Sequence, residues 1–204
     1  MPKISSYTTT APALTDKLIG TDTNDNSATK NFTVESIRDL VSFTKEVQVL
    51  DSSETTDQEL AASNTKTQVS FGSPTSNTNV SLNANGDVTI LSAGSYRFNL
   101  RLNSGCIQTA PGDIHIDFFY SVEKNSTQVE TTVQNTVYFD ASDAYPAQTL
   151  TFDQLSICEV GDVFKFYQAA SLWSPAVRSG LVETSVTTVG MSDVPSANIV
   201  VNKV

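Results

Sequence analysis

The sequence predicts an all-β protein: a ten-stranded antiparallel jelly-roll sandwich preceded by an extended arm and one short helix. Three observations lead to this fold class. From residue 46 onward apolar and polar residues alternate in short runs, turn residues separate these runs, and the one helical pattern lies before residue 45. Short strands at this spacing, with no helical period among them, indicate a closed or two-layered antiparallel fold.

The clearest strand is Tyr96–Asn103, in which every second residue is apolar. Successive side chains of a strand point to opposite faces, so we expect one face of this strand in the core and the other in water. Similar runs, separated by clusters of Gly, Pro, Asn, Asp and Ser, are Val47–Leu50, Thr67–Phe71, Val80–Leu82, Val88–Leu91, Ile114–Val122, Val129–Phe139, Thr149–Ile157, Val163–Ala169, Leu181–Val189 and Ala197–Val204.

One of these runs, Thr149–Ile157, is irregular. Its apolar residues occupy even positions up to Phe152 and odd positions from Leu155. A shift of one residue turns every side chain to the opposite face, so an uninterrupted strand cannot bury both sets. We therefore predict a bulge or bend near residues 153–154.

Two segments of the region after residue 45 carry a family resemblance. Gly86–Leu102 is similar to the strand, glycine turn and strand of the complement-type and tumour-necrosis-factor-like jelly rolls, and so is Leu155–Phe166 with its Gly-Asp turn. The resemblance covers residues 46–204. It implies a trimer of ten-stranded jelly rolls with apolar and aromatic side chains along a threefold axis.

The first 45 residues carry a second resemblance. Ala13–Asp22, followed by Asn26–Val34 and a short helix, resembles the N-terminal segment of many tailed-bacteriophage virion proteins, fibre and appendage subunits among them. This resemblance covers roughly residues 11–43. It implies an arm over residues 1–45 that binds other virion proteins of the capsid, tail or baseplate, and a head over residues 46–204.

The helix expected over residues 34 to about 43 is consistent with such an arm. Thr33 can cap it, and Phe32 can pack against Ile37 in its first turns. A helix of ten residues is too short to be stable alone in water, so its apolar stripe must be buried on the other chains, on the particle or on the chain's own head. The residues expected to anchor the arm are Leu14, Leu18, Ile19, Phe32, Ile37, Leu40 and Val41.

The charge balance excludes some partners. The 12 Lys and Arg residues face 22 Asp and Glu residues, a net charge of −10, so a phosphate backbone is repelled and no nucleic-acid binding is expected. No run approaches the roughly 20 apolar residues that span a bilayer, and the start does not resemble a signal peptide. We expect a virion protein that is made in the host cytoplasm and does not insert into membranes.

Cys106 and Cys158 are expected to be free thiols in or near the core.

Little in the sequence points to catalysis. The only histidine, His115, lies between Asp113 and Asp117, and a His–Asp pair suits general-base catalysis when a nucleophile is within reach. No nucleophile motif accompanies it, and the alternation places His115 on the outer face or at a subunit contact. We expect no enzyme and no cofactor.

A metal site is not expected either. Asp22–Ser27 spaces its oxygen ligands like a calcium loop, but Ser27 stands where the loop needs glycine and Thr33 where it needs a bidentate glutamate. Loop carboxylates such as Asp140 and Asp143 are better explained as solvated charge.

Function is expected in the loops, because a rigid sandwich commonly carries recognition there. Two loops, Phe139–Pro146 and Leu172–Gly180, contain Tyr145, Trp173 and Arg178, residue types that dominate binding hot spots. Trp173 could instead fold under its own loop or pack against another subunit. We expect a homotrimeric phage fibre subunit whose head adheres to a host-surface glycan or protein, with capsid decoration that reinforces the shell as the alternative.

Overall fold

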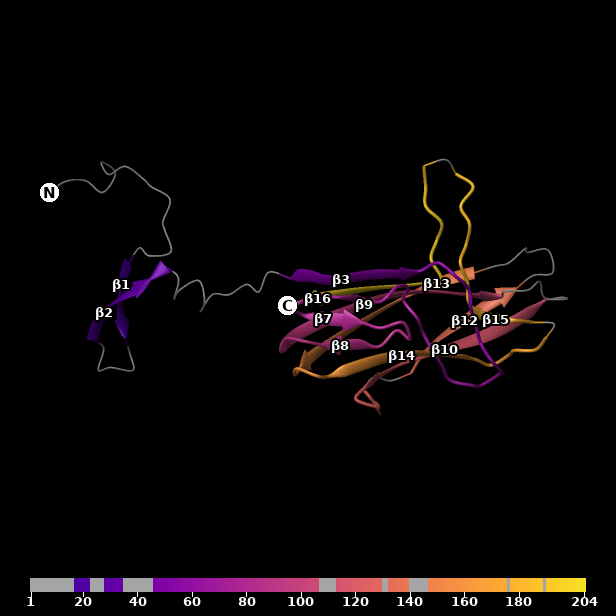
Figure 1. Cartoon of the computed structure of the whole chain (residues 1–204), viewed down its shortest axis with the longest axis horizontal. Coiled ribbons are helices and arrows are strands. Elements are labelled where there is room, and N and C mark those ends of the chain that lie inside the picture. The colour runs from indigo at the N-terminus through magenta and orange to yellow at the C-terminus, as the bar shows by residue number, and fades with distance from the viewer. Residues whose placement is uncertain are drawn as a thin grey trace. The chain divides into compact units, whose positions relative to one another are not determined.

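The computed structural model describes residues 17–22, 28–34, 46–106, 113–129, 132–139, 147–175, 177–188 and 190–204. The chain divides into two compact units, Met1–Lys45 and Glu46–Val204 (Figure 1). The helix expected over residues 34–43 lies outside the described residues apart from Val34, and so do the predicted anchoring residues Leu14, Ile37, Leu40 and Val41. No helix in the described part of the chain is long and apolar enough to cross a membrane.

The first unit contains a β-hairpin that the sequence analysis does not predict. β1 (Lys17–Asp22) and β2 (Ala28–Thr33) pair antiparallel without a register shift, and Leu18 lies opposite Phe32. Neither strand has a further partner among the described strands. An isolated two-stranded hairpin is at best marginally stable in water.

The second unit, the head, is all-β in its described residues and confirms the predicted fold class. It contains fourteen strands in two sheets of eight and six, and ten of the strands are longer than two residues. The ten are β3 (Val47–Glu54), β7 (Val80–Leu82), β8 (Val88–Ile90), β9 (Gly94–Cys106), β10 (Ile114–Lys124), β12 (Val133–Phe139), β13 (Ala147–Cys158), β14 (Val163–Ala170), β15 (Ser179–Leu181) and β16 (Ala197–Lys203). The four short ones are β4 (Gln58–Glu59), β5 (Thr67–Gln68), β6 (Thr75–Ser76) and β11 (Thr127–Gln128).

The strand pairing is that of a jelly roll. The first long strand pairs with the last, β3 with β16, and the next pairs are nested within it: β8 with β14, β9 with β13, and β10 with β12. All pairs are antiparallel. In one sheet the strand order is β13, β9, β16, β3; β15 also pairs with β9, beyond the end of β16, and β4 pairs with β15. In the other sheet the order is β12, β10, β14, β8, β7, β6.

The core lies between the two sheets, as the alternation predicts. Along β9 the apolar residues from Tyr96 to Leu102 are all buried, and Phe98 stacks on Phe164 of the opposite sheet with ring centroids 4.4 Å apart. Cys106 and Cys158 are both buried free thiols, and burial raises the pKa of each. This confirms the expected free cysteines near the core.

The predicted bulge in the irregular strand is wrong. β13 pairs with β9 in continuous register from Ala147 to Cys158, so the strand keeps one alternation along its whole length. Its inward positions after Phe152 are taken by the buried Gln154 and Cys158, whereas Leu155 and Ile157 point outward and are exposed. The prediction failed because it assumed that every apolar residue of the strand is buried within its own chain.

The register also fixes the two ends of the head. Val47 lies opposite Lys203 and Gly94 opposite Cys158, so the residue that follows the arm, Glu46, enters at the end where the chain also finishes. We call this the arm-joining end. Cys106 pairs with Ser179, and β12 ends and β13 begins at the other, distal end.

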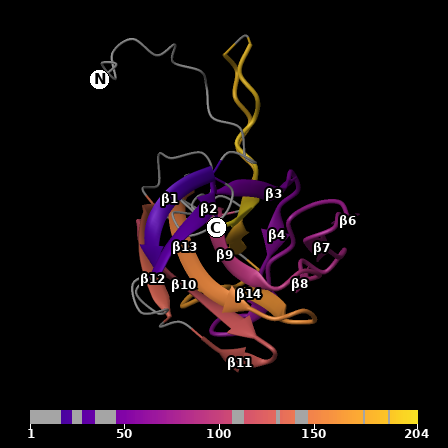
Figure 2. The same ribbon diagram turned by 90° about the vertical axis from the view of Figure 1, so that its left-hand side faces the viewer.

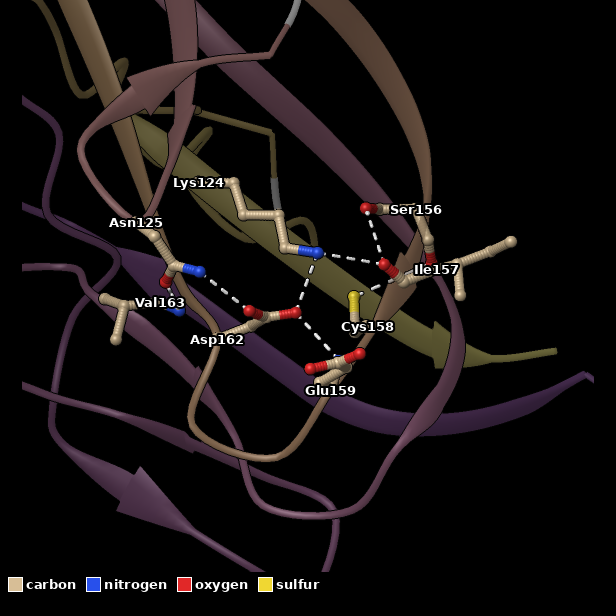
Figure 3. A network of polar contacts seen from close by, with 8 residues as sticks. All are labelled: Lys124, Asn125, Ser156, Ile157, Cys158, Glu159, Asp162 and Val163. Atoms are coloured by element: carbon tan, nitrogen blue, oxygen red, sulfur yellow. Dashed lines mark hydrogen bonds and ion pairs between the residues drawn. The ribbon is translucent and has the colours of Figure 1, made fainter.

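A polar network fastens two turns together at the arm-joining end (Figure 3). The Asp162 carboxylate accepts hydrogen bonds from Lys124 Nζ (2.7 Å), Asn125 Nδ2 (2.7 Å) and the Glu159 backbone N–H (2.8 Å). Lys124 also donates to the carbonyl of Ile157 at 3.0 Å. The turn after β10 is thus held against the turn between β13 and β14.

The two long sides of the sandwich differ. On the β3 side, polar bonds join the sheets: Ser52 Oγ donates to the Phe71 carbonyl (2.5 Å), and Gln58 Nε2 donates to the Ser70 carbonyl (3.0 Å). On the other side β12 and β13 are edge strands, each paired with only one strand among those described. That side therefore presents two unpaired strand edges.

Candidate functional site

The outer face of the six-stranded sheet changes character along its length. In its distal half the cross-strand rows are polar, for example Thr151, Arg101, Asn198 and Ser53 across β13, β9, β16 and β3. Toward the arm-joining end, β13 contributes Leu155 and Ile157 to this face. The face therefore offers an apolar contact at one end and hydrogen-bonding groups at the other.

The apolar contact, which we call the β13 apolar patch, consists of Leu155, Ile157 and the following Val160. Their side chains are 59%, 81% and 66% exposed. Scattered exposed apolar residues are ordinary, but here two of them share one face of a twelve-residue edge strand. Natural proteins usually cover or blunt such edges, so this patch is a candidate contact with another chain.

A second feature of the same sheet is a hairpin inserted into a strand position. β15 and β16 pair with consecutive stretches of β9, residues 104–106 and 96–102, so the chain leaves the sheet opposite Asn103 and returns there. The intervening segment, Val182–Ser196, projects away from the sheets in both views (Figures 1 and 2). We call it the projecting hairpin.

Asn103 holds both stems of the projecting hairpin. Its backbone N–H donates to the Ser196 carbonyl (2.9 Å), and its carbonyl accepts from the Val182 N–H (2.8 Å). Its side-chain Nδ2 donates to the Val182 carbonyl (2.7 Å) and to Thr184 Oγ1 (3.0 Å), while Thr149 Oγ1 donates to its Oδ1 at 3.2 Å. Asn103 points to the outer face, as the alternation predicts, but these contacts bury it instead of leaving it in water.

The strand expected over Leu181–Val189 is wrong at residues 182–188, and Val189 lies outside the described residues. β15 ends at Leu181, and the segment that follows forms the first stem, where Thr184 and Val194 exchange backbone hydrogen bonds of 2.9 Å. Its β-branched residues suit a hairpin stem as well as a sheet strand, so composition alone could not separate the two.

Beneath the projecting hairpin the outer face is hollowed into a cleft of about 620 Å³. Its floor comes from β3, β9, β13 and β16, and the returning stem of the hairpin forms one wall. It is lined by Asp51, Ser53, Arg101, Asn103, Thr149, Asp193, Val194, Pro195, Asn198 and Val200. The volume falls within the range of about 300–1,000 Å³ that is typical of ligand sites.

The electrostatics of the cleft are mixed. Asp51 accepts from Asn198 Nδ2 (3.2 Å), and Asp193 accepts from the Val186 backbone N–H (2.6 Å). Near the hairpin root, burial together with the neighbouring Asp193 carboxylate raises the pKa of Glu183. Among the described residues, no group of three His, Cys, Asp or Glu side chains is placed to hold a metal ion.

At the distal end, Trp173 and Arg178 meet on Glu59. Trp173 Nε1 donates to Glu59 Oε1 at 3.2 Å, Arg178 Nε donates to the same oxygen at 2.7 Å, and Arg178 Nη2 pairs with Glu59 Oε2. The hydrogen bond from Arg178 lowers the pKa of Glu59. Trp173 is half-buried and packs against the core, while Arg178 keeps part of its guanidinium in water.

The remaining candidate contact residue, Tyr145, lies outside the described residues. β12 ends and β13 begins at the distal end. The structure thus brings Trp173 and Arg178 together, and their role in recognition stays a prediction. Of the predicted anchoring residues, Leu18 and Ile19 lie in β1 and Phe32 in β2.

His115 lies on the outer face of the eight-stranded sheet, exposed and opposite Tyr138, whose ring centroid is 6.1 Å away. The neighbouring Asp117 accepts a hydrogen bond of 2.6 Å from Thr136 Oγ1, which lowers the pKa of this carboxyl. The surroundings of His115 are those of a surface residue on a sheet.

No family model matches the sequence, and no curated protein matches it. In structure, the chain is similar to the Eiger TNF of S. frugiperda, with a TM-score of 0.40, 10% sequence identity, and coverage of 78% of this chain and 92% of that chain. The jelly-roll assignment of the head rests on its own strand pairing.

Sequence reasoning missed the cleft and the projecting hairpin. The only signal of the hairpin was the turn Ser192–Pro195, which does not say that the flanking strands share one partner strand. No signal indicated the cleft, because its lining comes from four strands and the returning stem of the hairpin, which only the three-dimensional pairing brings together.

Proposed function

We propose that this chain is a structural protein of a phage virion: a homotrimeric fibre or appendage subunit, anchored by its N-terminal arm, whose β head adheres to a host surface. The phage assignment rests on the resemblance of residues 11–43. One observation carries the orientation. Glu46, which follows the arm, enters at one end of the head, whereas the loop with Trp173 and Arg178 lies at the other. Recognition residues far from the attachment point suit an outward-facing head. No catalytic step is part of the proposal.

Self-association is supported by the β13 apolar patch. Fully burying a Leu or Ile side chain stabilises by about 1.5–3 kcal/mol, and both residues are now mostly in water. The patch occupies an edge of the sandwich, and a threefold arrangement requires that a second copy cover it with a different surface of its own. Such head-to-tail contacts form a closed ring when the rotation between copies is 120°, and a ring of three chains satisfies the proposal.

The arm is the second support. Among the described strands β1 and β2 pair only with each other, which leaves both outer edges of the hairpin open. A two-stranded hairpin is at best marginally stable by itself, so a bound partner would stabilise it. A virion protein that adds a strand to either edge would supply the missing partner.

Capsid decoration is the alternative function, and the net charge favours it. A chain with a charge of −10 avoids non-specific adhesion to anionic cell envelopes, which suits a shell protein with no cell contact. Adhesion requires a specific receptor contact that overcomes the same repulsion.

A binding assay separates the two functions. Fluorescently labelled full chain is incubated with host cells, and particles that lack the protein are tested for adsorption and for resistance to heat. Adhesion predicts that the chain binds cells and that the deficient particles stay intact but adsorb poorly. Decoration predicts no binding to cells and particles that release their contents at lower temperature.

A further inference from the structure

The cleft beneath the projecting hairpin contains an arginine, Arg101, that the chain itself leaves without a partner. Arg101 is exposed and has no ion pair or hydrogen bond among the described residues. Arg97, on the same strand and face, instead pairs with Glu46 (3.2 Å) and Asp153 (3.8 Å). In a chain with such an excess of acidic residues, an arginine without a partner in a cleft is available to a ligand.

The cleft also contains acceptors that could pair with Arg101 but do not. Asp51 and Asp193 line the same hollow but accept from Asn198 Nδ2 and the Val186 N–H, and among the described residues neither forms an ion pair with Arg101. The space between donors and acceptors is therefore open to a ligand that satisfies both. Arginine offers five N–H donors and each carboxylate only acceptors, so the ligand must accept on one side and donate on the other.

Charge and shape narrow the ligand class further. Two carboxylates disfavour an anion, and the arginine disfavours a cation. Val194, Pro195 and Val200 add apolar surface to the lining. Hydroxyl groups both donate and accept, and a pyranose ring carries them around an apolar C–H face, so a neutral saccharide meets all of these conditions.

The site is also held in shape before any ligand arrives. The returning stem contributes Asp193, Val194 and Pro195 to the wall, and the buried Asn103 fixes both stems to β9. A preorganised wall lowers the entropy lost on binding. We infer that this cleft binds a neutral saccharide of the host surface. The inference rests on the proposed adhesive function and adds to it the site and the ligand class.

The test uses the full chain and the variants Arg101→Ala and Asp193→Asn, with Arg97→Ala as the matched control. Arg97→Ala removes the same charge from the same face of β9 but lies outside the cleft. Each protein is applied to an array of immobilised neutral and acidic oligosaccharides, and the strongest binder is titrated by calorimetry. We expect neutral oligosaccharides to bind, Arg101→Ala to weaken binding roughly 10- to 100-fold, and Arg97→Ala to change it less than about threefold.

Several results would overturn the inference. Equal binding by Arg101→Ala and the unaltered chain would do so, as would binding of acidic oligosaccharides only. If Arg101→Ala lowers the solution mass while Arg97→Ala does not, the cleft is a subunit contact and not a ligand site. If the chain binds cells but no neutral oligosaccharide, the saccharide site is wrong and adhesion stands; if it binds neither, both are wrong.

Discussion

Replacing Asp162 with alanine tests whether the network at the arm-joining end stabilises the head. The carboxylate is buried, 8% exposed, and accepts three hydrogen bonds of 2.7–2.8 Å. A hydrogen bond to a charged group contributes about 1.5–3 kcal/mol, and a buried donor that loses its partner costs about 1–3 kcal/mol. Asn125 and Glu159 are exposed, so in Asp162→Ala water can replace the lost partner of their donors, and we expect the free energy of unfolding to fall by about 1.5–3 kcal/mol at pH 7.

The pH dependence follows from the pKa of Asp162. Burial alone would raise this pKa, but the hydrogen bonds from Lys124, the Glu159 N–H and Asn125 outweigh burial and hold it below its ordinary value. A carboxyl whose pKa is depressed by folding stabilises the protein above its unfolded pKa of about 3.9 and loses that contribution as the pH falls through the folded pKa. The difference between the variant and the unaltered chain should therefore shrink below about pH 4.

The assay is urea denaturation at equal chain concentrations, at pH 7 and at steps down to pH 2.5, because oligomer stability depends on concentration. Asp153→Ala is the matched control: Asp153 is 56% exposed, and its carboxylate lies 3.8 Å from Arg97, so its loss should change the free energy by less than about 1 kcal/mol. A deficit for Asp162→Ala below about 1 kcal/mol at pH 7, or one that stays constant down to pH 2.5, would refute the reasoning.

Three further predictions test other parts of the account. The double change Leu155→Asp with Ile157→Asp should convert the proposed trimer to single chains in light scattering, because it places charge in the β13 apolar patch. Val129→Asp, at a 39% exposed residue outside the patch, should leave the mass unchanged, and an equal loss of mass in both variants would argue against the patch. Ile37→Asp or Leu40→Asp should abolish incorporation into particles while the solution mass stays the same, and normal incorporation would exclude the anchor. Gly86→Ala should lower the free energy of unfolding by about 3 kcal/mol or more, because φ is 87° and an added Cβ would meet the Val69 carbonyl oxygen at 2.0 Å. Gly161→Ala, with φ of 92° and open space around the added Cβ, should lower it by only about 1–2 kcal/mol. Equal losses for the two variants in urea denaturation would contradict this prediction.

The alternation in the sequence predicted the sandwich because its period matches the pleat of a half-buried strand. It placed the apolar residues of β9 in the core correctly, and the number and spacing of the cysteines correctly predicted two free thiols. The same rule failed at β13, where Leu155 and Ile157 are apolar but exposed. Periodicity predicts which residues share one face of a strand. It does not predict whether that face packs against the same chain or against another molecule.

The candidate site could be predicted only in part. Trp173 and Arg178 were singled out by residue type, but their meeting on Glu59 depends on the pairing of β15 with β4. Asn103 carries no distinguishing signal in a strand of alternating residues. Its importance arises because β15 and β16 share β9 as a partner, which no local pattern encodes.

The measurement that tests the central claim most directly is the solution mass of the full chain, by light scattering on a sizing column. The account predicts a homotrimer of about 66 kDa, three times the chain mass of 21.9 kDa. A mass near 21.9 kDa at micromolar concentration would contradict it, because the β13 apolar patch would then stay exposed to water with no second copy to cover it.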